Sequence, residues 1–118
     1  MDGMKNNTIN FIELQAIDLG QIKKFYSATF GWTFTDYGDR YCDFHGAGIA
    51  GGFAKTNTVT TGGTLVVLYH ENLVETIEKI KEHGGKITTD TFSFPGGTRF
   101  DFTDPSGNKL AVWCPTTV

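Results

Sequence analysis

The chain has 118 residues, of which 39% are hydrophobic and 19% are charged, so it has the size of one domain and the composition of neither a disordered nor a membrane protein. Ten Lys and Arg against thirteen Asp and Glu give a net charge of -3 without a basic block, which excludes the electrostatic signature of a nucleic-acid binder. The longest apolar run, residues 65–69, is far shorter than the roughly 20 residues that span a bilayer, and the first residues do not resemble a signal peptide. We therefore predict a cytoplasmic protein that binds neither membranes nor nucleic acid.

The first half of the chain predicts a strand, a helix and three further strands. Residues 10–16 alternate, which indicates a strand with Ile12, Leu14 and Ala16 on one face and Phe11, Glu13 and Gln15 on the other. Asp18 followed by Gln21 is typical of a helix N-terminal cap, and Gly31 is typical of a C-terminal cap. The three later strands are predicted at residues 32–35, 41–45 and 49–54, separated by turns rich in Gly and Asp.

The same order of elements returns after the polar linker at residues 55–61. Asn72 and Glu75 predict the start of a second helix, which Gly85 helps to end, between strands predicted at residues 65–69, 86–92, 98–102 and 109–113. An offset of 54 residues relates Gly31 to Gly85. The chain is therefore predicted to be an α+β protein in which a βαβββ module occurs twice, at about 9–54 and 62–114, within one domain covering residues 1–118.

Two motifs, together with this duplicated order, resemble the vicinal oxygen chelate superfamily. They are Phe25-Tyr26 followed by Phe30-Gly31-Trp32 in the first half, and Gly84-Gly85 followed by Phe-Thr-Asp-Pro-Ser-Gly-Asn at residues 102–108 in the second. The superfamily includes glyoxalase I, bleomycin and fosfomycin resistance proteins and extradiol dioxygenases. The resemblance implies two tandem βαβββ modules that form a half-open curved barrel around a central cleft, and it also implies a homodimer.

The resemblance further implies four strand positions at which the superfamily usually holds a divalent metal. In this chain these positions are occupied by Phe11, Ala50, Leu65 and Ala111. None of these side chains offers a nitrogen, oxygen or sulfur ligand. His70 does not replace them, because strand alternation places it on the face turned toward the helix. We therefore predict no metal site and no other cofactor.

Strand alternation selects a set of residues on the opposite face, toward the cleft. They are Phe11, Glu13, Gln15, Leu65, Val67, Tyr69, Ala111 and Trp113. This mixture of apolar, aromatic and a few polar groups is typical of a small-molecule pocket, although Phe11 and Trp113 fit simple core packing equally well. A carboxylate on the concave side of a sheet must be paired, hydrated or functional. Partial burial would raise the pKa of Glu13 and make it a candidate general base.

The two arginines stand just ahead of matching aspartates in the two halves. Arg40 precedes Asp43, and Arg99 precedes Asp101. These residues are interpreted either as ion pairs within hairpins or as contacts for an anionic ligand, in which case Arg99 belongs to the binding site.

Three functions are compatible with these features. The first is a metal-free glyoxalase- or bleomycin-resistance-like protein that binds or sequesters a small organic ligand. The second is a glyoxalase-like lyase or isomerase, which would use either an unforeseen metal site or Glu13 as a metal-free base. The third is a structural or regulatory subunit whose cleft is filled by its own aromatic side chains.

Overall fold

The computed structural model describes residues 4–116, which form two modules with one four-stranded sheet and one helix each. The first module contains β1 (Ile12–Ala16), α1 (Leu19–Phe30), β2 (Thr33–Asp36), β3 (Tyr41–His45) and β4 (Gly51–Lys55). The second contains β5 (Val66–Tyr69), α2 (Leu73–Glu82), β6 (Lys86–Phe94), β7 (Gly97–Thr103) and β8 (Lys109–Pro115). The predicted α+β fold with two βαβββ modules is confirmed.

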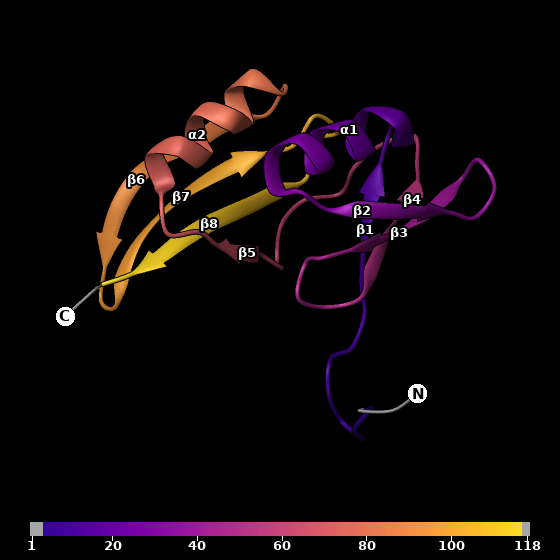
Figure 1. The fold of residues 1–118 in the computed structure, drawn as a ribbon, viewed down its shortest axis with the longest axis horizontal. Helices are drawn as coiled ribbons and strands as arrows, with labels where there is room; N and C mark the ends of the chain where they lie inside the picture. Colours follow the sequence, from indigo (N-terminus) through magenta and orange to yellow (C-terminus); the bar gives the residue numbers. More distant parts are fainter. Residues whose placement is uncertain (1–3, 117–118) are drawn as a thin grey trace.

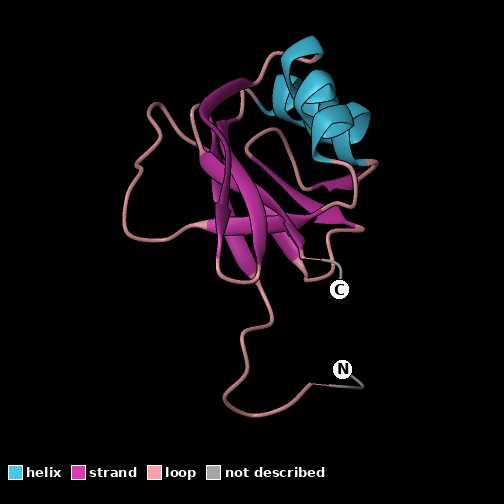
Figure 2. Ribbon diagram, turned by 90° about the vertical axis from the view of Figure 1, so that its left-hand side faces the viewer, coloured by secondary structure: helices cyan, strands magenta, loops and turns pink. Residues whose placement is uncertain are grey.

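Both sheets have the same topology, with strand orders β1-β4-β3-β2 and β5-β8-β7-β6. The first strand of each module pairs in parallel with the last, and the other neighbours are antiparallel. The two sheets do not join, so the barrel is half open. Both helices lie on the same side of the sheets (Figure 1), and the perpendicular view in Figure 2 shows the same arrangement. Each sheet therefore has one helix-covered face and one helix-free face.

The helix ends follow the capping residues in the sequence. The Asp18 side chain accepts a hydrogen bond from the backbone N–H of Gln21 at 3.0 Å, and Asn72 does the same for Glu75 at 3.0 Å. Gly31 has a φ of 74°, the left-handed conformation that closes α1. Neither helix of the described residues has the length and apolar character needed to cross a membrane.

The helix-covered faces form one hydrophobic cluster that contains residues of both modules. The apolar stripe of α1 predicts that Phe25 packs on the sheet of its own module. The structure instead places the Phe25 ring 6.2 Å from the ring of Phe102 in the second module. The cause is that α1 lies beside α2, so this side of α1 turns toward the second module. Phe25 therefore helps to hold the two modules together.

The Asp104 carboxylate forms a polar link inside this apolar contact. Its Oδ1 accepts hydrogen bonds at 2.9–3.0 Å from the three backbone N–H groups of residues 106–108, which fixes the turn. Its Oδ2 accepts a 2.8 Å hydrogen bond from the Tyr26 hydroxyl of the first module. Burial and the facing carboxylate raise the pKa of Tyr26 well above its ordinary value, so the hydroxyl remains a donor.

The same turn forms two further hydrogen bonds to the first module. The Asn108 side-chain amide donates to the backbone carbonyl of Gln15 at 2.6 Å, and the backbone N–H of Ile17 donates to Ser106 Oγ at 3.0 Å. The motif that carries the family resemblance is thus a structural clamp between the modules, and it lies next to the end of β1.

Candidate functional site

The helix-free face of the first module is polar and acidic. Strand register places Glu13 beside Gly52 and Gly52 beside Asp43, so these positions share a face. The Tyr41 ring crosses the space above Gly52, where a Cβ atom would come too close to the hydroxyl. Burial, followed by the neighbouring Asp43 and Glu13 carboxylates, raises the pKa of Tyr41 to about 12. The Tyr41 hydroxyl therefore stays protonated near neutral pH, close to the Asp43 and Glu13 carboxylates.

One end of this acidic face borders a hollow of about 330 Å³, lined by Phe11, Asp43 and His45 among others. His45 Nε2 lies 2.9 Å from Thr35 Oγ1, so a hydroxyl orients the imidazole. This end of the face therefore combines the aromatic rings of Phe11 and Phe44 with polar groups.

The helix-free face of the second module is aromatic and carries excess positive charge. Register places Tyr69 and Arg99 beside Trp113, and Phe92 beside Arg99. The Arg99 guanidinium lies 5.1 Å from the centre of the Phe92 ring, within the range of a cation–π contact. This face therefore offers stacking surfaces with a cation among them.

Arg99 is held in place by an ion pair with Asp101. Arg99 Nε lies 3.1 Å from Asp101 Oδ1, and Lys109 Nζ lies 3.9 Å from Asp101 Oδ2. The hairpin ion pair predicted for Arg99 is thus observed. Because two cations surround one carboxylate, one positive charge remains for an anionic ligand group.

The structure brings most of the predicted cleft residues to the helix-free faces, with different accessibilities. Phe11, Val67 and Tyr69 are 45%, 44% and 62% exposed, respectively. Trp113 is half-buried beside Phe94, with the ring centres 6.3 Å apart. Ala111 is fully buried within β8.

Leu65 and Gln15 complete the set of predicted cleft residues. Leu65 is half-buried just before β5 begins. Gln15 turns its side chain to the linker, where Oε1 accepts a 2.7 Å hydrogen bond from the backbone N–H of Thr60. This hydrogen bond forms because the linker folds onto β1. Strand alternation alone therefore could not predict it.

Glu13 is exposed, which contradicts the partial burial on which its role as a general base depends. It borders a hollow of about 300 Å³ that is also lined by Thr60 and Lys109. The curved sheet leaves the carboxylate hydrated at the junction of the modules. Glu13 therefore lacks the desolvated surroundings that a metal-free general base would use.

The four positions at which the superfamily usually holds a metal do not fit one in this chain. Phe11 and Ala50 are exposed, Leu65 is half-buried and Ala111 is buried, and none has a donor atom. Among residues 4–116, no three or more His, Cys, Asp or Glu side chains gather so that they could hold a metal ion. We therefore derive no chemistry through a metal.

The folded chain belongs to a recognisable class: two βαβββ modules joined side by side, with their helix-free faces available to ligands. The family model described as the Glyoxalase/Bleomycin resistance protein/Dioxygenase superfamily matches residues 8–112. The chain belongs to this superfamily.

Individual relatives support the same assignment. A glyoxylase-like domain-containing protein from Didymella fabae is 31% identical over 122 residues, which cover 88% of this chain and 91% of the relative. A solved glyoxalase/bleomycin resistance protein/dioxygenase family enzyme from Burkholderia phytofirmans has a TM-score of 0.78 at 11% identity, covering 91% of this chain and 98% of that one. A fosfomycin resistance protein from Mesorhizobium loti has a TM-score of 0.75 at 12% identity, covering 96% and 95% of the two chains. The solved structures support the fold.

Proposed function

We propose that the protein binds or sequesters a small, partly aromatic organic molecule on its helix-free faces, without a metal. The observation that carries this proposal is the group of Tyr69, Phe92, Arg99 and Trp113 on one face of β5 to β8. Aromatic rings offer stacking area, and the ion-paired guanidinium offers a fixed charge. The absence of donor atoms at Phe11, Ala50, Leu65 and Ala111 supports a metal-free mode of binding.

A ligand on this face needs both apolar contact and a polar anchor. At about 25 cal/mol per Å², burial of roughly 200 Å² of apolar ligand surface contributes about 5 kcal/mol before the entropy of association is subtracted. Micromolar binding requires about 8 kcal/mol, so polar groups must supply the difference. Glu13 suits a cationic or hydroxylated group, and Arg99 suits an anionic one.

A metabolite screen followed by thermal shift and Trp fluorescence tests this proposal. A ligand that stacks on the face should raise the melting temperature and change the emission of Trp113. If a broad screen changes neither signal, the helix-free face is not a binding site for small molecules.

Replacing Glu13 by Gln should weaken binding of a cationic or hydroxylated ligand by about 1.5 to 3 kcal/mol, because a hydrogen bond to a charged group is lost. Isothermal titration calorimetry measures the effect. Glu78→Gln, at an exposed position on α2, is the matched control and should leave the affinity unchanged. Equal affinities of Glu13→Gln and wild type would remove Glu13 from the site.

The proposal includes a homodimer in which a second copy covers part of the helix-free faces. The exposed apolar side chains Phe11, Val67, Tyr69 and Phe92 support it, because two-fold contacts commonly cover such surface. Light scattering in the micromolar range should give twice the monomer mass of 13.0 kDa. A monomer mass throughout that range would overturn the dimer.

Binding is preferred to catalysis because Glu13 is exposed and thus lacks the burial that a metal-free lyase or isomerase would use.

A cytoplasmic location is part of the proposal. The free thiols of Cys42 and Cys114 support it, since reduced cysteines are usual in that compartment.

A further inference from the structure

A groove of about 930 Å³ lies between the two modules along β5, where Val66 and Leu68 of the helix-covered face and Val67 and Tyr69 of the helix-free face all line it. It follows the exposed edge of β5 and is bordered by β1, the end of α1 and the loop at residues 46–49. Its size is in the range of small-molecule sites. The groove therefore has room for an organic ligand.

The walls of the groove are apolar and come from both modules. They include Ile12 and Leu14 from β1, Trp32 after α1, and Val66 and Leu68 from β5. All of these side chains except Ile12 belong to, or pack against, the shared hydrophobic cluster. The walls are thus fixed by the fold and would favour a hydrocarbon body.

One end of the groove carries a hydrogen-bond donor whose orientation is fixed. The backbone N–H of Asn72 donates to His70 Nδ1 at 2.9 Å. Nδ1 is therefore unprotonated, and the neutral imidazole carries its hydrogen on Nε2. His70 lines the groove, so this donor is available at its edge.

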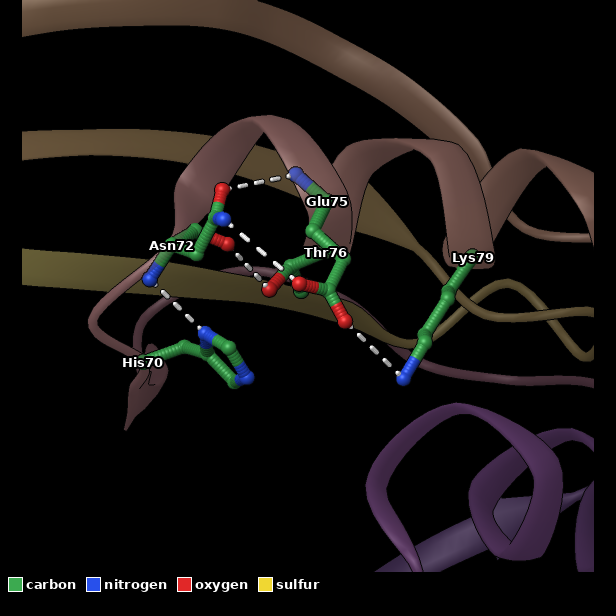
Figure 3. Close-up of polar contacts among 5 residues, drawn as sticks. All are labelled: His70, Asn72, Glu75, Thr76 and Lys79. Carbon is green, nitrogen blue, oxygen red and sulfur yellow. Dashed lines mark hydrogen bonds and ion pairs between the residues drawn. The ribbon is translucent and has the colours of Figure 1, made fainter.

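Lys79 also lines the groove and provides a cation. Figure 3 shows Lys79 and His70 extending from the α2 region on the side where α1 lies. Lys79 Nζ is 3.4 Å from Glu75 Oε1, and Asn72 Nδ2 is 3.5 Å from the other oxygen of Glu75. Both charged side chains are about half exposed, so their ion pair is weak and the ammonium can turn to a ligand.

A buried hydroxyl in the groove gives an independent indication of a ligand. Thr29 on α1 lines the groove and is 7% exposed. Its Oγ1 has no hydrogen-bond partner within residues 4–116. Because buried hydroxyls are nearly always hydrogen-bonded, this group lacks a partner that a bound molecule could supply.

We propose that this groove binds an amphipathic monoanion, a molecule with a hydrocarbon body and one carboxylate or similar anionic group. The body lies along β1 and β5, and the anionic group accepts hydrogen bonds from His70 Nε2 and Lys79 Nζ. This site shares Val67 and Tyr69 with the helix-free face of the second module, but its polar groups, His70 and Lys79, do not belong to that face.

The two tryptophans allow the sites to be tested separately, because Trp32 borders the groove and Trp113 lies on the opposite face. In the Trp113→Phe variant, dodecanoate below its micelle concentration should change Trp32 emission. Dodecanol and dodecyltrimethylammonium serve as uncharged and cationic probes of equal chain length. Dodecanoate should bind most tightly, and the cationic probe most weakly.

Lys79→Gln should weaken dodecanoate binding about five- to ten-fold and dodecanol binding less than about two-fold, because one charged hydrogen bond is lost. Lys81→Gln, at an exposed position on the same helix, is the matched control and should leave both affinities unchanged.

Equal binding of the three probes would overturn the inference, and so would equal effects of Lys79→Gln and Lys81→Gln. The inference would also fail if only Trp113, in the Trp32→Phe variant, responded to dodecanoate. The last result would favour the helix-free face, so the two proposals fail on different outcomes. If a second copy of the chain filled the groove, Trp32 emission would not respond to dodecanoate, and Lys79→Gln would dissociate the dimer. This combination would also contradict the ligand site.

Discussion

Replacing Asp104 by Ala is expected to lower the free energy of unfolding by about 3 to 5 kcal/mol, near the upper end of single-substitution effects. The substitution removes the acceptor for three backbone N–H groups, the Tyr26 hydroxyl and the Asn108 amide. These donors are largely buried and would lose both their partner and access to water. Urea denaturation at fixed protein concentration measures the change.

The control for this prediction is Asp39→Ala, at an exposed turn position, which should change stability by less than about 0.5 kcal/mol. Asp104→Asn, which keeps one carbonyl oxygen, should fall between the two. If Asp104→Ala is no more destabilising than Asp39→Ala, the turn does not clamp the modules together.

Replacing Phe25 by Ala should cost about 3 to 5 kcal/mol, because it leaves a cavity where the two modules meet. The ring is 1% exposed and contacts Tyr26, Phe30 and Phe102. Val74→Ala, at an exposed position on α2, is the control. A loss below about 0.5 kcal/mol for Phe25→Ala would show that the buried face of α1 is assigned incorrectly.

A double-mutant cycle with Phe102→Ala then tests the contact between modules. The two substitutions should be non-additive by about 0.5 kcal/mol or more, because the rings share one packing site. Additive losses would mean that each ring packs independently within its own module.

Much of the fold follows from local sequence rules. Alternation in residues 10–16 sets the two faces of β1, and Asp18, Asn72 and Gly31 mark helix ends through bonds that involve only nearby residues. The same alternation predicts that Phe11, Val67, Tyr69 and Trp113 share the helix-free side. These features were predictable because they depend on period and capping.

Features that depend on how the two modules pack against each other could not be predicted from local sequence rules. The sequence identifies residues 104–108 as a turn, but the bond from Tyr26 to Asp104 spans 78 positions. The bond from Thr60 to Gln15, the burial of Ala111 and the groove beside β5 likewise depend on the folded linker and the placement of one sheet beside the other. The sequence signal for the contact between the modules was Asp104 itself, because an acidic residue inside a family motif often accepts several hydrogen bonds.

The most direct test of metal-free ligand binding combines metal analysis with calorimetry on the same preparation. Protein purified without chelators should contain no stoichiometric zinc, nickel, iron or manganese. The dissociation constant and binding enthalpy of a ligand from the metabolite screen should be unchanged after exhaustive EDTA treatment and dialysis. A stoichiometric metal whose removal lowers the melting temperature and abolishes binding, with recovery when the metal is restored, would contradict the account.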